Sequence, residues 1–592
     1  MPDPVFNVSH SAREMRWQWR MSPLPLDTAD ALPADDLAAR LLLSRGCDMR
    51  EIAQTLRPSL RDWLPDPSIF RDMDRLAARL ADAVETGEQI ALFADYDVDG
   101  ATSAAFLWRQ LRALGAHVTP YIPDRILEGY GPNAEALLQL QQGGATLVLL
   151  LDCGTQAFAP LQAARDAGLD VAVVDHHKAS TALPPALALV NPNRLDESAD
   201  AAHYGTLCTA GLAFLLGVAL NRELRRRGAF ASRPEPAISR WLDIIALGTV
   251  ADVVPLKGLN RALVALGLRR LHERQTPGLA ALAEVAGLDG TLRADDLGFH
   301  LGPRINAGGR IGDSSLGVRL LASDDAAETA RIAAELDQLN ADRRAIEAQV
   351  TDAAFALAAE QEPQSVAIVA GTGWHPGVVG IVASRLKEKL QRPTLVLSID
   401  ENGIAKGSGR SIPGVDLGAA VLAAKAHGLI AEGGGHAMAC GVTLDQAGLP
   451  QLRDWLAGHL TQAVAQASRA QTLAIDLAVA PRAVTPELAQ ALDACGPYGQ
   501  DWPAPRVAVG PVQLLRADAV GRTEPKTHLR FVARGPDGGR IEGIAFRALE
   551  SALGTMLIEA GKQPLYLAGR IKADSWQGRV RAQLQLEDAA LA

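Results

Sequence analysis

The feature that most restricts the fold is a regular alternation of short apolar runs with amphipathic stretches between residues 89 and 174. Four of the apolar runs have the length of buried strands, and the segments between them repeat apolar residues at helical spacing. The predicted strands are 90–94, 118–122, 146–151 and 170–174, and the predicted helices are 102–114, 133–141 and 157–167. Because strands that alternate with helices need crossover connections, this region predicts a parallel sheet covered by helices.

The other parts of the 592-residue chain predict further domains. Residues 326–361 contain no Gly or Pro and repeat apolar residues at helical spacing, which predicts one long connecting helix. A second α/β pattern follows it, and the last part has the short strands and turns of a small β-barrel. The expected boundaries are a helical segment at 1–70 (clearest helix 37–43), a catalytic α/β domain at 71–325, the helix at 326–362, a second α/β domain at 363–465 and a barrel at 466–592.

Acidic and imidazole side chains follow three of the predicted strands, at the point where each strand ends. The first strand runs into Asp95-Tyr96-Asp97-Val98-Asp99-Gly100, the third ends in Asp152-Cys153-Gly154, and the fourth ends in Asp175-His176-His177. In an open parallel sheet, ligands bind outside the carboxyl ends of the strands. The sequence therefore predicts that these side chains meet at one edge of the sheet.

Carboxylates that are gathered in this way repel one another and are costly to remove from water, so the cluster needs a cation. Shells rich in carboxylates with one or two imidazoles suit Mg²⁺ or Mn²⁺ better than zinc or copper. More than four acidic ligands from separate strands indicate two ions, which can activate a water and hold a phosphoryl oxygen. The pattern thus predicts metal-dependent chemistry on a phosphate.

Each motif by itself also has a purely structural interpretation. The Asp95–Gly100 loop could be a helix N-cap or a turn, Asp-Cys-Gly could be a turn, and the two histidines could be a satisfied polar pair. Their occurrence together, at the ends of consecutive predicted strands, favours the functional interpretation.

Composition narrows the class of protein. With 58 basic and 68 acidic residues the net charge is −10, so bulk positive charge cannot be the basis of nucleic-acid binding. Five cysteines without a CxxC pair argue against disulfides and a thiolate zinc site. The longest clean apolar stretch, 210–220, is shorter than the ~20 residues of a membrane span, and the first residues do not resemble a signal peptide. We therefore expect a cytoplasmic protein.

The motifs resemble those of the DHH phosphoesterase superfamily. Asp-x-Asp-x-Asp-Gly, Asp-Cys-Gly and Asp-His-His are followed by Gly-Thr-Val-Ala-Asp-Val-Val-Pro-Leu at 248–256. Within the superfamily, LGPRINAGGR at 301–310, WHPGVVGIVASR at 374–385, KGSGRS at 406–411 and GGGH at 433–436 resemble the RecJ family of single-strand-specific exonucleases. The resemblance runs from about residue 41 onward and implies a C-terminal OB-fold that binds single strands.

The resemblance implies roles for particular residues. Asp97 and Asp152 would hold one Mn²⁺ or Mg²⁺, and Asp99, Asp152, His176 and Asp252 the other. His177 would contact the scissile phosphate, with Asp175 and Asp95 as further catalytic residues, Asp95 behind the ligands. The pyrophosphatase branch of the superfamily has a His where this chain has Phe93, so water is expected to complete the first metal's shell.

Phosphate contacts are implied by the same resemblance. Arg125, Ser408 and Arg410 would form a pocket for the 5′ phosphate, because guanidinium groups pair well with phosphate. Arg304, Arg310 and His436 would contact the backbone of the strand. Arg310 could also simply hold its own loop, and the glycine run before His436 could be a structural turn.

The expected activity is hydrolysis of single-stranded DNA from the 5′ end to 5′-mononucleotides by two metal ions, in DNA repair and recombination. Two alternatives stay open: a phosphoesterase of the same superfamily acting on nucleotides or very short oligonucleotides, and a non-catalytic DNA-binding scaffold on a decayed core. The expected partners are single-stranded DNA, a single-strand-binding protein and a helicase, with no membrane, and the chain is expected to be a monomer.

Overall fold

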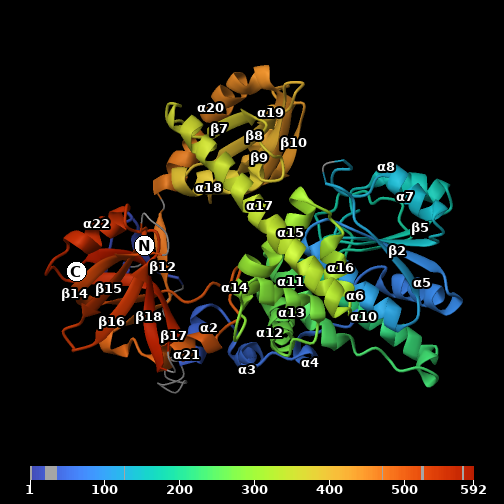
Figure 1. The fold of residues 1–592 in the computed structure, drawn as a ribbon, viewed down its shortest axis with the longest axis horizontal. Coiled ribbons are helices and arrows are strands. Elements are labelled where there is room, and N and C mark those ends of the chain that lie inside the picture. The colour runs from blue at the N-terminus through green and yellow to red at the C-terminus, as the bar shows by residue number, and fades with distance from the viewer. Residues whose placement is uncertain (1–2, 21–36, 126, 470, 522–525, 577–578) are drawn as a thin grey trace. The chain divides into compact units, whose positions relative to one another are not determined.

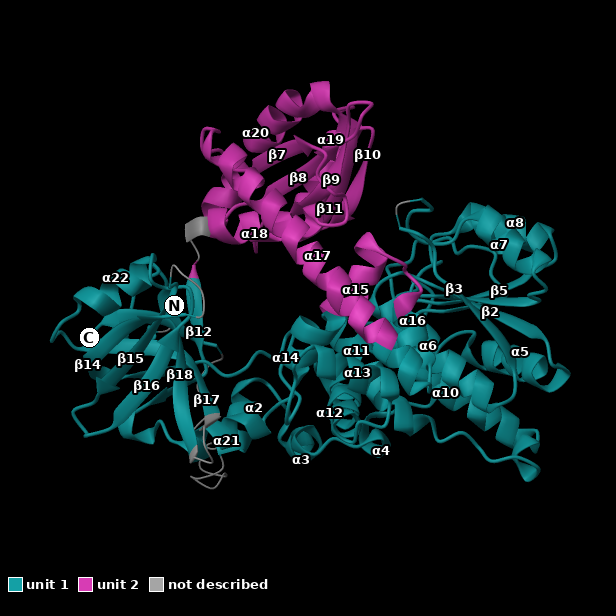
Figure 2. Cartoon of the chain, in the orientation of Figure 1, with its two compact units in different colours: residues 1–302, 317–330, 472–592 teal, residues 303–316, 331–471 magenta. Residues whose placement is uncertain are grey.

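The computed structural model describes residues 3–20, 37–125, 127–469, 471–521, 526–576 and 579–592. The chain forms two compact units (Figure 2). The first comprises residues 1–302, 317–330 and 472–592, and the second comprises residues 303–316 and 331–471.

The first unit contains a five-stranded sheet with the order β3-β2-β4-β5-β6, in which every neighbouring pair is parallel (Figure 1). The strands are β2 (Gln89–Ala94), β3 (His117–Tyr121), β4 (Leu147–Leu151), β5 (Asp170–Val174) and β6 (Ala188–Val190). The accompanying helices are α5 (Met73–Thr86), α6 (Val98–Ala113), α7 (Ala134–Gln142) and α8 (Phe158–Asp166). All five residues of β4 are buried, as expected for a sheet covered on both faces. The predicted parallel sheet is confirmed, and β6 is a strand that the sequence analysis did not find.

Helices follow the sheet in the sequence. They are α9 (Ala199–Ala202), α10 (Thr209–Arg226), α11 (Leu242–Ala251), α12 (Gly258–His272), α13 (Pro277–Val285), α14 (Ala294–Asp296), α15 (Gly302–Ile311), α16 (Leu316–Ala322) and α17 (Ala326–Ala359). The predicted long helix is confirmed as α17, which begins in the first unit and ends in the second. No helix among the described residues has the length and apolar character needed to cross a bilayer.

The second unit has a mixed sheet with the order β10-β11-β9-β8-β7. Only β7 and β8 are parallel, and the other pairs are antiparallel. The strands are β7 (Ala367–Thr372), β8 (Thr394–Ile399), β9 (Ile404–Arg410), β10 (Glu432–His436) and β11 (Ala439–Asp445), and the helices are α18 (Val379–Leu390), α19 (Leu417–Ala426) and α20 (Leu449–Arg469). The predicted second α/β domain is thus confirmed, and its antiparallel half comes from glycine-rich strands that the periodicity did not reveal.

The C-terminal strands form a barrel in the first unit. They are β13 (Leu477–Val479), β14 (Val507–Val520), β15 (His528–Arg534), β16 (Arg540–Ala545), β17 (Leu565–Trp576) and β18 (Arg579–Leu591), with helices α21 (Pro486–Ala494) and α22 (Ala552–Glu559). Pairing of β14 with β17 closes the sheet on itself. The predicted OB-like barrel is confirmed. Val580, Ala582, Leu584 and Leu586 alternate with polar residues along β18, as expected for a strand with one face toward a core.

The N-terminal segment packs on this barrel, and its described part is not entirely helical. The expected helix near 37–43 is α2 (Leu37–Ser44), followed by the short helices α3 (Ile52–Leu56) and α4 (Leu60–Trp63). Before them, β1 (Arg16–Trp19) pairs in parallel with β12 (Thr472–Ile475). Trp17 is fully buried, and its indole N–H donates to Asp588 Oδ2 at 2.9 Å. A strand forms here because Trp17 fills an apolar layer beside the barrel.

Arg261 of α12 joins three segments of the first unit that are far apart in the sequence. Its side chain is almost fully buried and donates to the backbone carbonyls of Thr55, Cys495, Gly496 and Pro497. Its guanidinium also lies 5.4 Å from the ring of Trp502. Burial lowers the pKa of Arg261 to about 10.

We predict that Arg261→Ala lowers the free energy of unfolding of the first unit by at least ~2 kcal/mol, because several buried carbonyls lose a charged donor. Urea denaturation followed by tryptophan fluorescence measures the change. Arg269→Ala, at an exposed position of the same helix, is the control and should change the stability by less than ~0.5 kcal/mol. Equal stability of the two variants would contradict the assignment.

Candidate metal centre and active site

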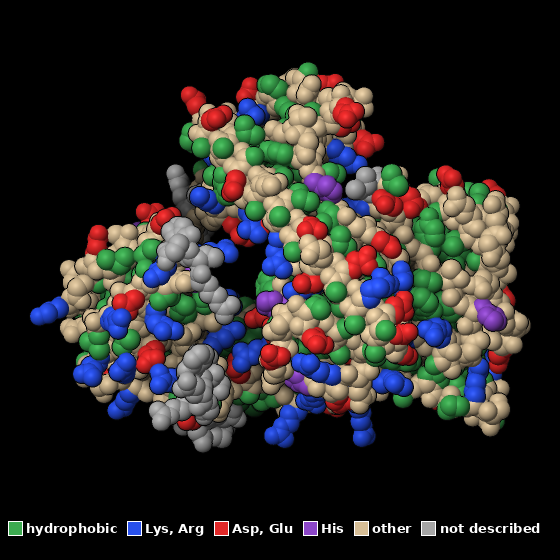
Figure 3. Space-filling model, in the orientation of Figure 1, with side chains coloured by type: hydrophobic (Ala, Val, Ile, Leu, Met, Phe, Trp, Pro, Cys, Tyr) green, Lys and Arg blue, Asp and Glu red, His purple; other side chains and the backbone are tan. Residues whose placement is uncertain are grey.

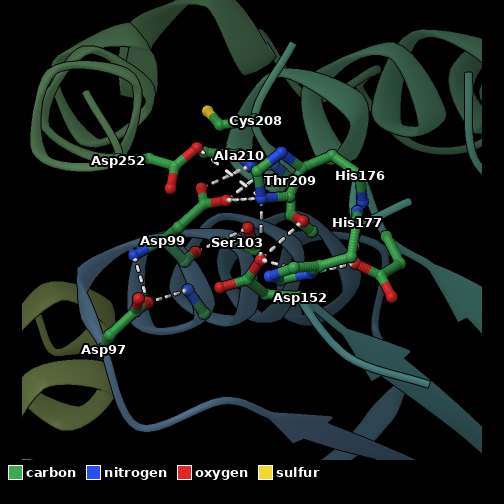
Figure 4. Close-up of polar contacts among 12 residues, drawn as sticks. Asp97, Asp99, Ser103, Asp152, His176, His177, Cys208, Thr209, Ala210 and Asp252 are labelled. Atoms are coloured by element: carbon green, nitrogen blue, oxygen red, sulfur yellow. Dashed lines mark hydrogen bonds and ion pairs between the residues drawn. The ribbon is translucent and has the colours of Figure 1, made fainter. Parts of the chain in front are cut away.

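Seven side chains from four segments of the first unit converge at the carboxyl edge of the parallel sheet, and Figure 4 labels all of them except Asp95. They are Asp95, Asp97, Asp99, Asp152, His176, His177 and Asp252. Asp95 and Asp97 follow β2, Asp99 lies in the first turn of α6, Asp152 follows β4, and Asp252 follows α11. Their ligand atoms form three overlapping groups, each within 4.8 Å, and the groups share Asp152 and His176.

His176 lies at the centre of the carboxylates (Figure 4). Its Nε2 atom is 3.4 Å from Asp152 Oδ1, 3.6 Å from Asp252 Oδ2 and 3.9 Å from Asp99 Oδ2. The imidazole and three carboxylate oxygens thus surround one small space. This is a set of donors that a divalent cation can use.

The beginning of α10 fixes two of the carboxylates. The backbone N–H of Thr209 donates to Asp99 Oδ2 at 2.7 Å, and that of Ala210 donates to Asp99 Oδ1 at 2.8 Å. The hydroxyl of Thr209 donates to Asp152 Oδ1 at 3.1 Å. These N–H groups have no partner within the helix, and the positive end of the helix favours a negative charge. Sequence reasoning missed Thr209 and Ala210, whose only signal is their place at the start of the apolar stretch 210–220.

Two backbone features allow the close approach. Asp152 has a positive φ of 62°, a conformation that is uncommon for residues other than glycine. Gly248 of α11 faces α6 and α10, and a Cβ atom there would lie 2.3 Å from Thr102 Oγ1 and 3.3 Å from Asp99 Oδ1. A side chain at this position would push on Asp99.

His177 lies beside Asp152, with its Nδ1 atom 4.0 Å from Asp152 Oδ1, and is held by Asp175. Asp175 Oδ1 lies 2.7 Å from His177 Nδ1, and Asp175 Oδ2 accepts the backbone N–H of Thr155 at 3.1 Å. Burial opposes ionisation of both groups, but their mutual hydrogen bond outweighs it. The pKa of Asp175 is lowered, and that of His177 is raised to about 9. The Tyr130 hydroxyl lies 3.5 Å from the His177 ring, a neighbour that the sequence analysis did not identify.

The carboxylates of the cluster are crowded and removed from water. Burial, with Asp97 as the next cause, raises the pKa of Asp95 to about 8. Burial, with Asp99 and Asp97, raises the pKa of Asp252 to about 9. Burial and neighbouring carboxylates also raise the pKa of Asp99 and Asp152. Among the described residues, no Lys or Arg forms an ion pair with any of the five.

The cluster therefore fits bound cations. Asp95 Oδ1 and Asp252 Oδ2 are buried and accept no hydrogen bond from the described residues. Unpaired buried carboxylate oxygens are costly, and a divalent cation satisfies them. Asp95, expected to lie behind the ligands, instead forms a group with Asp97 and Asp152. Phe93 is buried against Tyr121, with ring centroids 5.2 Å apart, and offers no ligand.

The residues expected to bind phosphate lie in both units. In the first, the guanidinium of Arg125 lies 5.1 Å from the ring of Tyr96, in the loop after β2. In the second, Ser408 and Arg410 lie on β9 beside the first turn of α18. A Cβ atom at Gly380 would lie 3.4 Å from Ser408 Oγ and 3.1 Å from Arg410 Nη2.

The remaining three candidates, also in the second unit, differ in how they are held. Arg304 Nε donates to Asp337 Oδ1 at 2.9 Å. Arg310 Nη1 donates to the carbonyl of Gly377 at 2.9 Å, so it does hold a loop. His436 is the last residue of β10 and is exposed. Arg304 and Arg310 therefore have structural partners, whatever else they contact.

The barrel region of the sequence has a nearly balanced charge. Residues 475–588 contain 14 Lys and Arg and 13 Asp and Glu, whereas the whole chain carries −10. Figure 3 shows many Lys and Arg side chains over the barrel. Its surface is thus less repulsive to a polyanion than the net charge implies.

Three family models match this chain. The model of the DHH family N-terminal domain matches residues 89–249, that of the DHHA1 domain matches 363–466, and that of the RecJ OB domain matches 475–588. The first contains the strands and most of the acidic cluster, and the third contains the barrel.

Relatives match along nearly the whole chain. The single-stranded-DNA-specific exonuclease RecJ of Bacillus subtilis is 34% identical over 98% of this chain and 71% of its own length. The single-stranded-DNA-specific exonuclease RecJ of Dickeya dadantii is 36% identical over 94% of this chain and 96% of its own length. The crystal structure of RecJ in complex with Mn²⁺ from Thermus thermophilus superposes with a TM-score of 0.77 at 30% identity, covering 97% of this chain and 79% of that chain. A crystal structure of exonuclease RecJ bound to manganese superposes with a TM-score of 0.56 at 35% identity. The match covers 67% of this chain and 97% of that chain.

We predict that Mn²⁺ binding to the metal-free protein at pH 7 releases protons and tightens as the pH rises toward 9. The pKa values of Asp95 and Asp252, about 8 and about 9, lie above pH 7, so both carboxyls hold protons that a metal must displace. Calorimetry in buffers of different ionisation enthalpy counts the protons. The Asp252→Asn variant should release fewer protons when it binds Mn²⁺. Binding of Mn²⁺ to the wild type without any proton release at pH 7 would refute the charge assignment.

Proposed function

The chain belongs to the RecJ family of single-stranded-DNA-specific exonucleases, and we infer that it hydrolyses single-stranded DNA from the 5′ end to 5′-mononucleotides. The observation that carries this inference is the cluster of five buried or half-buried carboxylates and His176, on a chain that also contains the RecJ OB domain. An acidic cluster of this kind supports phosphodiester hydrolysis, and the barrel supports a polymeric single-stranded substrate.

The cofactor is a divalent metal, Mn²⁺ or Mg²⁺. Asp97 and Asp152 would hold one ion, with Asp95 beside them, and Asp99, Asp152, His176 and Asp252 the other. Bound cations supply activation of a water and neutralisation of charge on the phosphate. Asp152 belongs to both sets, so its orientation decides the geometry of the whole centre. Thr209 and the positive φ of Asp152 fix that orientation.

We assign His177 to the scissile phosphate. Its pKa of about 9 keeps the imidazole protonated at neutral pH, so it can donate a hydrogen bond to a phosphate oxygen. Asp175 makes all of its described contacts with the protein, which supports a role in holding His177 rather than in touching the substrate.

No protein nucleophile is needed. Cys153 follows the shared ligand Asp152, but it is fully buried. Burial and the neighbouring carboxylates raise the pKa of its thiol well above the usual value, so it stays protonated. We therefore assign Cys153 to packing.

We propose that Arg125, Ser408 and Arg410 contact the 5′ phosphate, and that Arg304, Arg310 and His436 contact the strand backbone. The side chains of Ser408 and Arg410 lie close together on β9, next to the first turn of α18, where the positive end of a helix also favours an anion. Arg304 and Arg310 would add phosphate contacts to their existing bonds.

The barrel favours a long strand over a very short one. A phosphoesterase for nucleotides or very short oligonucleotides does not need an OB domain, whereas base stacking and backbone contacts on a barrel bind strands without regard to sequence. Cleavage rates of a dinucleotide and of a long single strand distinguish the two activities, and preference for the dinucleotide would reject the exonuclease.

This activity belongs to DNA repair and recombination. We propose that the enzyme acts in the cytoplasm as a monomer. A helicase that unwinds duplex DNA and a single-strand-binding protein that covers the product are the partners that we propose, because a single-strand-specific nuclease needs an unwound substrate.

We predict that Asp152→Asn lowers the cleavage rate more than ~1,000-fold, since metal ions contribute several kcal/mol of transition-state stabilisation. Asn tolerates the positive φ of this position, so the fold and strand binding should remain. Release of a labelled 5′ nucleotide and a gel-shift assay measure the two properties. Asp200→Asn, an exposed carboxylate of α9, serves as the control. Wild-type cleavage by Asp152→Asn would reject the assignment.

We predict that Arg410→Ala lowers cleavage of 5′-phosphorylated strands at least ~10-fold more than cleavage of 5′-hydroxyl strands, because a charge-assisted pair with the phosphate is lost. The ratio of kcat/KM for the two substrates measures the effect. Lys425→Ala removes an exposed charge from the same unit and should leave the ratio unchanged. Equal losses of kcat/KM on both substrates would mean that Arg410 contacts another part of the strand and not the 5′ phosphate.

A further inference from the structure

The backbone of the adjacent residues His176 and His177 is held entirely by side chains. Asp175 Oδ1 accepts both of their N–H groups, at 2.7 Å from His176 and 3.1 Å from His177. Asn193 Nδ2 donates to the His176 carbonyl at 2.6 Å, and Asn191 Nδ2 donates to the His177 carbonyl at 2.8 Å. All four polar backbone groups of the pair therefore have a side-chain partner.

The two asparagines reach this position because of β6. Val174 of β5 lies beside Val190 of β6, and the backbone N–H of Asp175 donates to the Val190 carbonyl at 3.1 Å. Asn191 thus leaves the sheet at the level of Asp175, one strand further along. A strand of three residues places amide groups beside the two histidines.

The asparagine side chains are themselves fixed. Asn191 is fully buried, its amide also donates to Thr155 Oγ1 at 2.9 Å, and its oxygen accepts the N–H of Asn193 at 2.8 Å. The amide of Asn193 also donates to the Gly205 carbonyl at 3.0 Å. An asparagine amide has two N–H donors, and both donors of each residue are used. The pair links the loops after β4, β5 and β6.

We propose that Asn191 and Asn193 are positioning residues with separable effects on the two histidines. Asn193 holds the peptide that joins His176 to His177, so it fixes the His176 ring among the carboxylates and also influences His177. Asn191 holds the peptide after His177, so its direct hydrogen bond acts on His177 and not on His176. The inference rests on the proposed roles of His176 at the metal and His177 at the phosphate.

The effect of losing such a hydrogen-bond partner has a known size. Removing the group that orients a metal ligand costs about 10- to 100-fold in metal affinity or activity. In this site the loss of an amide also leaves a buried carbonyl without a donor, which favours a rotated peptide. A rotated peptide between the histidines would turn the His176 ring away from the carboxylates.

The test titrates Mn²⁺ into the metal-free full-length protein and follows free Mn²⁺ by electron paramagnetic resonance. Asn193→Ala should weaken Mn²⁺ binding about 10-fold or more. Asn191→Ala should bind Mn²⁺ as the wild type does but turn over single-stranded DNA about 10-fold or more slowly at saturating Mn²⁺. Asn221→Ala is the matched control, a buried asparagine of α10 that donates to the Pro236 carbonyl at 3.0 Å away from the site. It should lower stability without changing either property.

Gly205→Ala tests the same inference with every native hydrogen-bonding group kept. A Cβ atom there would lie 2.7 Å from Asn193 Oδ1 and displace the amide. We expect weaker Mn²⁺ binding than in the wild type, in the same direction as for Asn193→Ala. This variant decides the matter if Asn193→Ala does not fold.

Two outcomes overturn the inference. One is Mn²⁺ affinity unchanged in Asn193→Ala and Gly205→Ala, and the other is Mn²⁺ affinity lost equally in Asn191→Ala and Asn193→Ala. His176→Ala separates this result from the proposed function. If His176→Ala keeps wild-type Mn²⁺ affinity, the metal assignment fails, whereas if it loses affinity while Asn193→Ala does not, only the positioning role fails.

Discussion

Repulsion among buried carboxylates is the constraint on which the rest of the active site depends. Five carboxylates, three buried and two half-buried, lie at one edge of the parallel sheet, and none has a Lys or Arg ion-pair partner among the described residues. Without a cation, burial and mutual repulsion raise the pKa of four of the five. The folded protein therefore holds these groups in a crowded and poorly hydrated arrangement, in which a bound cation replaces protons and relieves the repulsion.

The fold keeps that charge in place with backbone groups instead of basic side chains. The first N–H groups of α10 hold Asp99, and Asp97 caps α6 by accepting from the N–H groups of Asp99 and Gly100. A basic side chain would compete with the metal for the same oxygens, whereas an N–H group orients a carboxylate and leaves oxygen lone pairs available. The sheet, the helix ends and Gly248 thus serve one purpose, which is to let acidic groups approach one another without neutralising them.

The sequence predicts those parts of the site that depend on local patterns of residues. Apolar runs gave the strands β2 to β5, and the acids at their ends gave the members of the cluster. The sequence could not show that Asp95 lies beside Asp97, because both follow the same strand and only the turn geometry decides. Nor could it show Asn191, Asn193 or Thr209, whose roles depend on hydrogen bonds to backbone groups distant in sequence. β6 was missed because three residues are too few for periodicity, and β1 because its partner lies more than 400 residues away.

The union of the N-terminal strand with the barrel has a consequence for synthesis on the ribosome. Trp17 leaves the ribosome long before its partner Asp588, which is 571 residues further along the chain. Through most of translation, the apolar side chains that flank Trp17 have no surface to cover them, and the barrel closes only when β17 and β18 have emerged. Contacts between residues so far apart in the sequence form slowly. The nascent chain therefore carries an exposed apolar segment that chaperones can bind. Nascent chains that stop short of the barrel would keep this segment uncovered, which gives the cell's proteases a means of recognising unfinished copies.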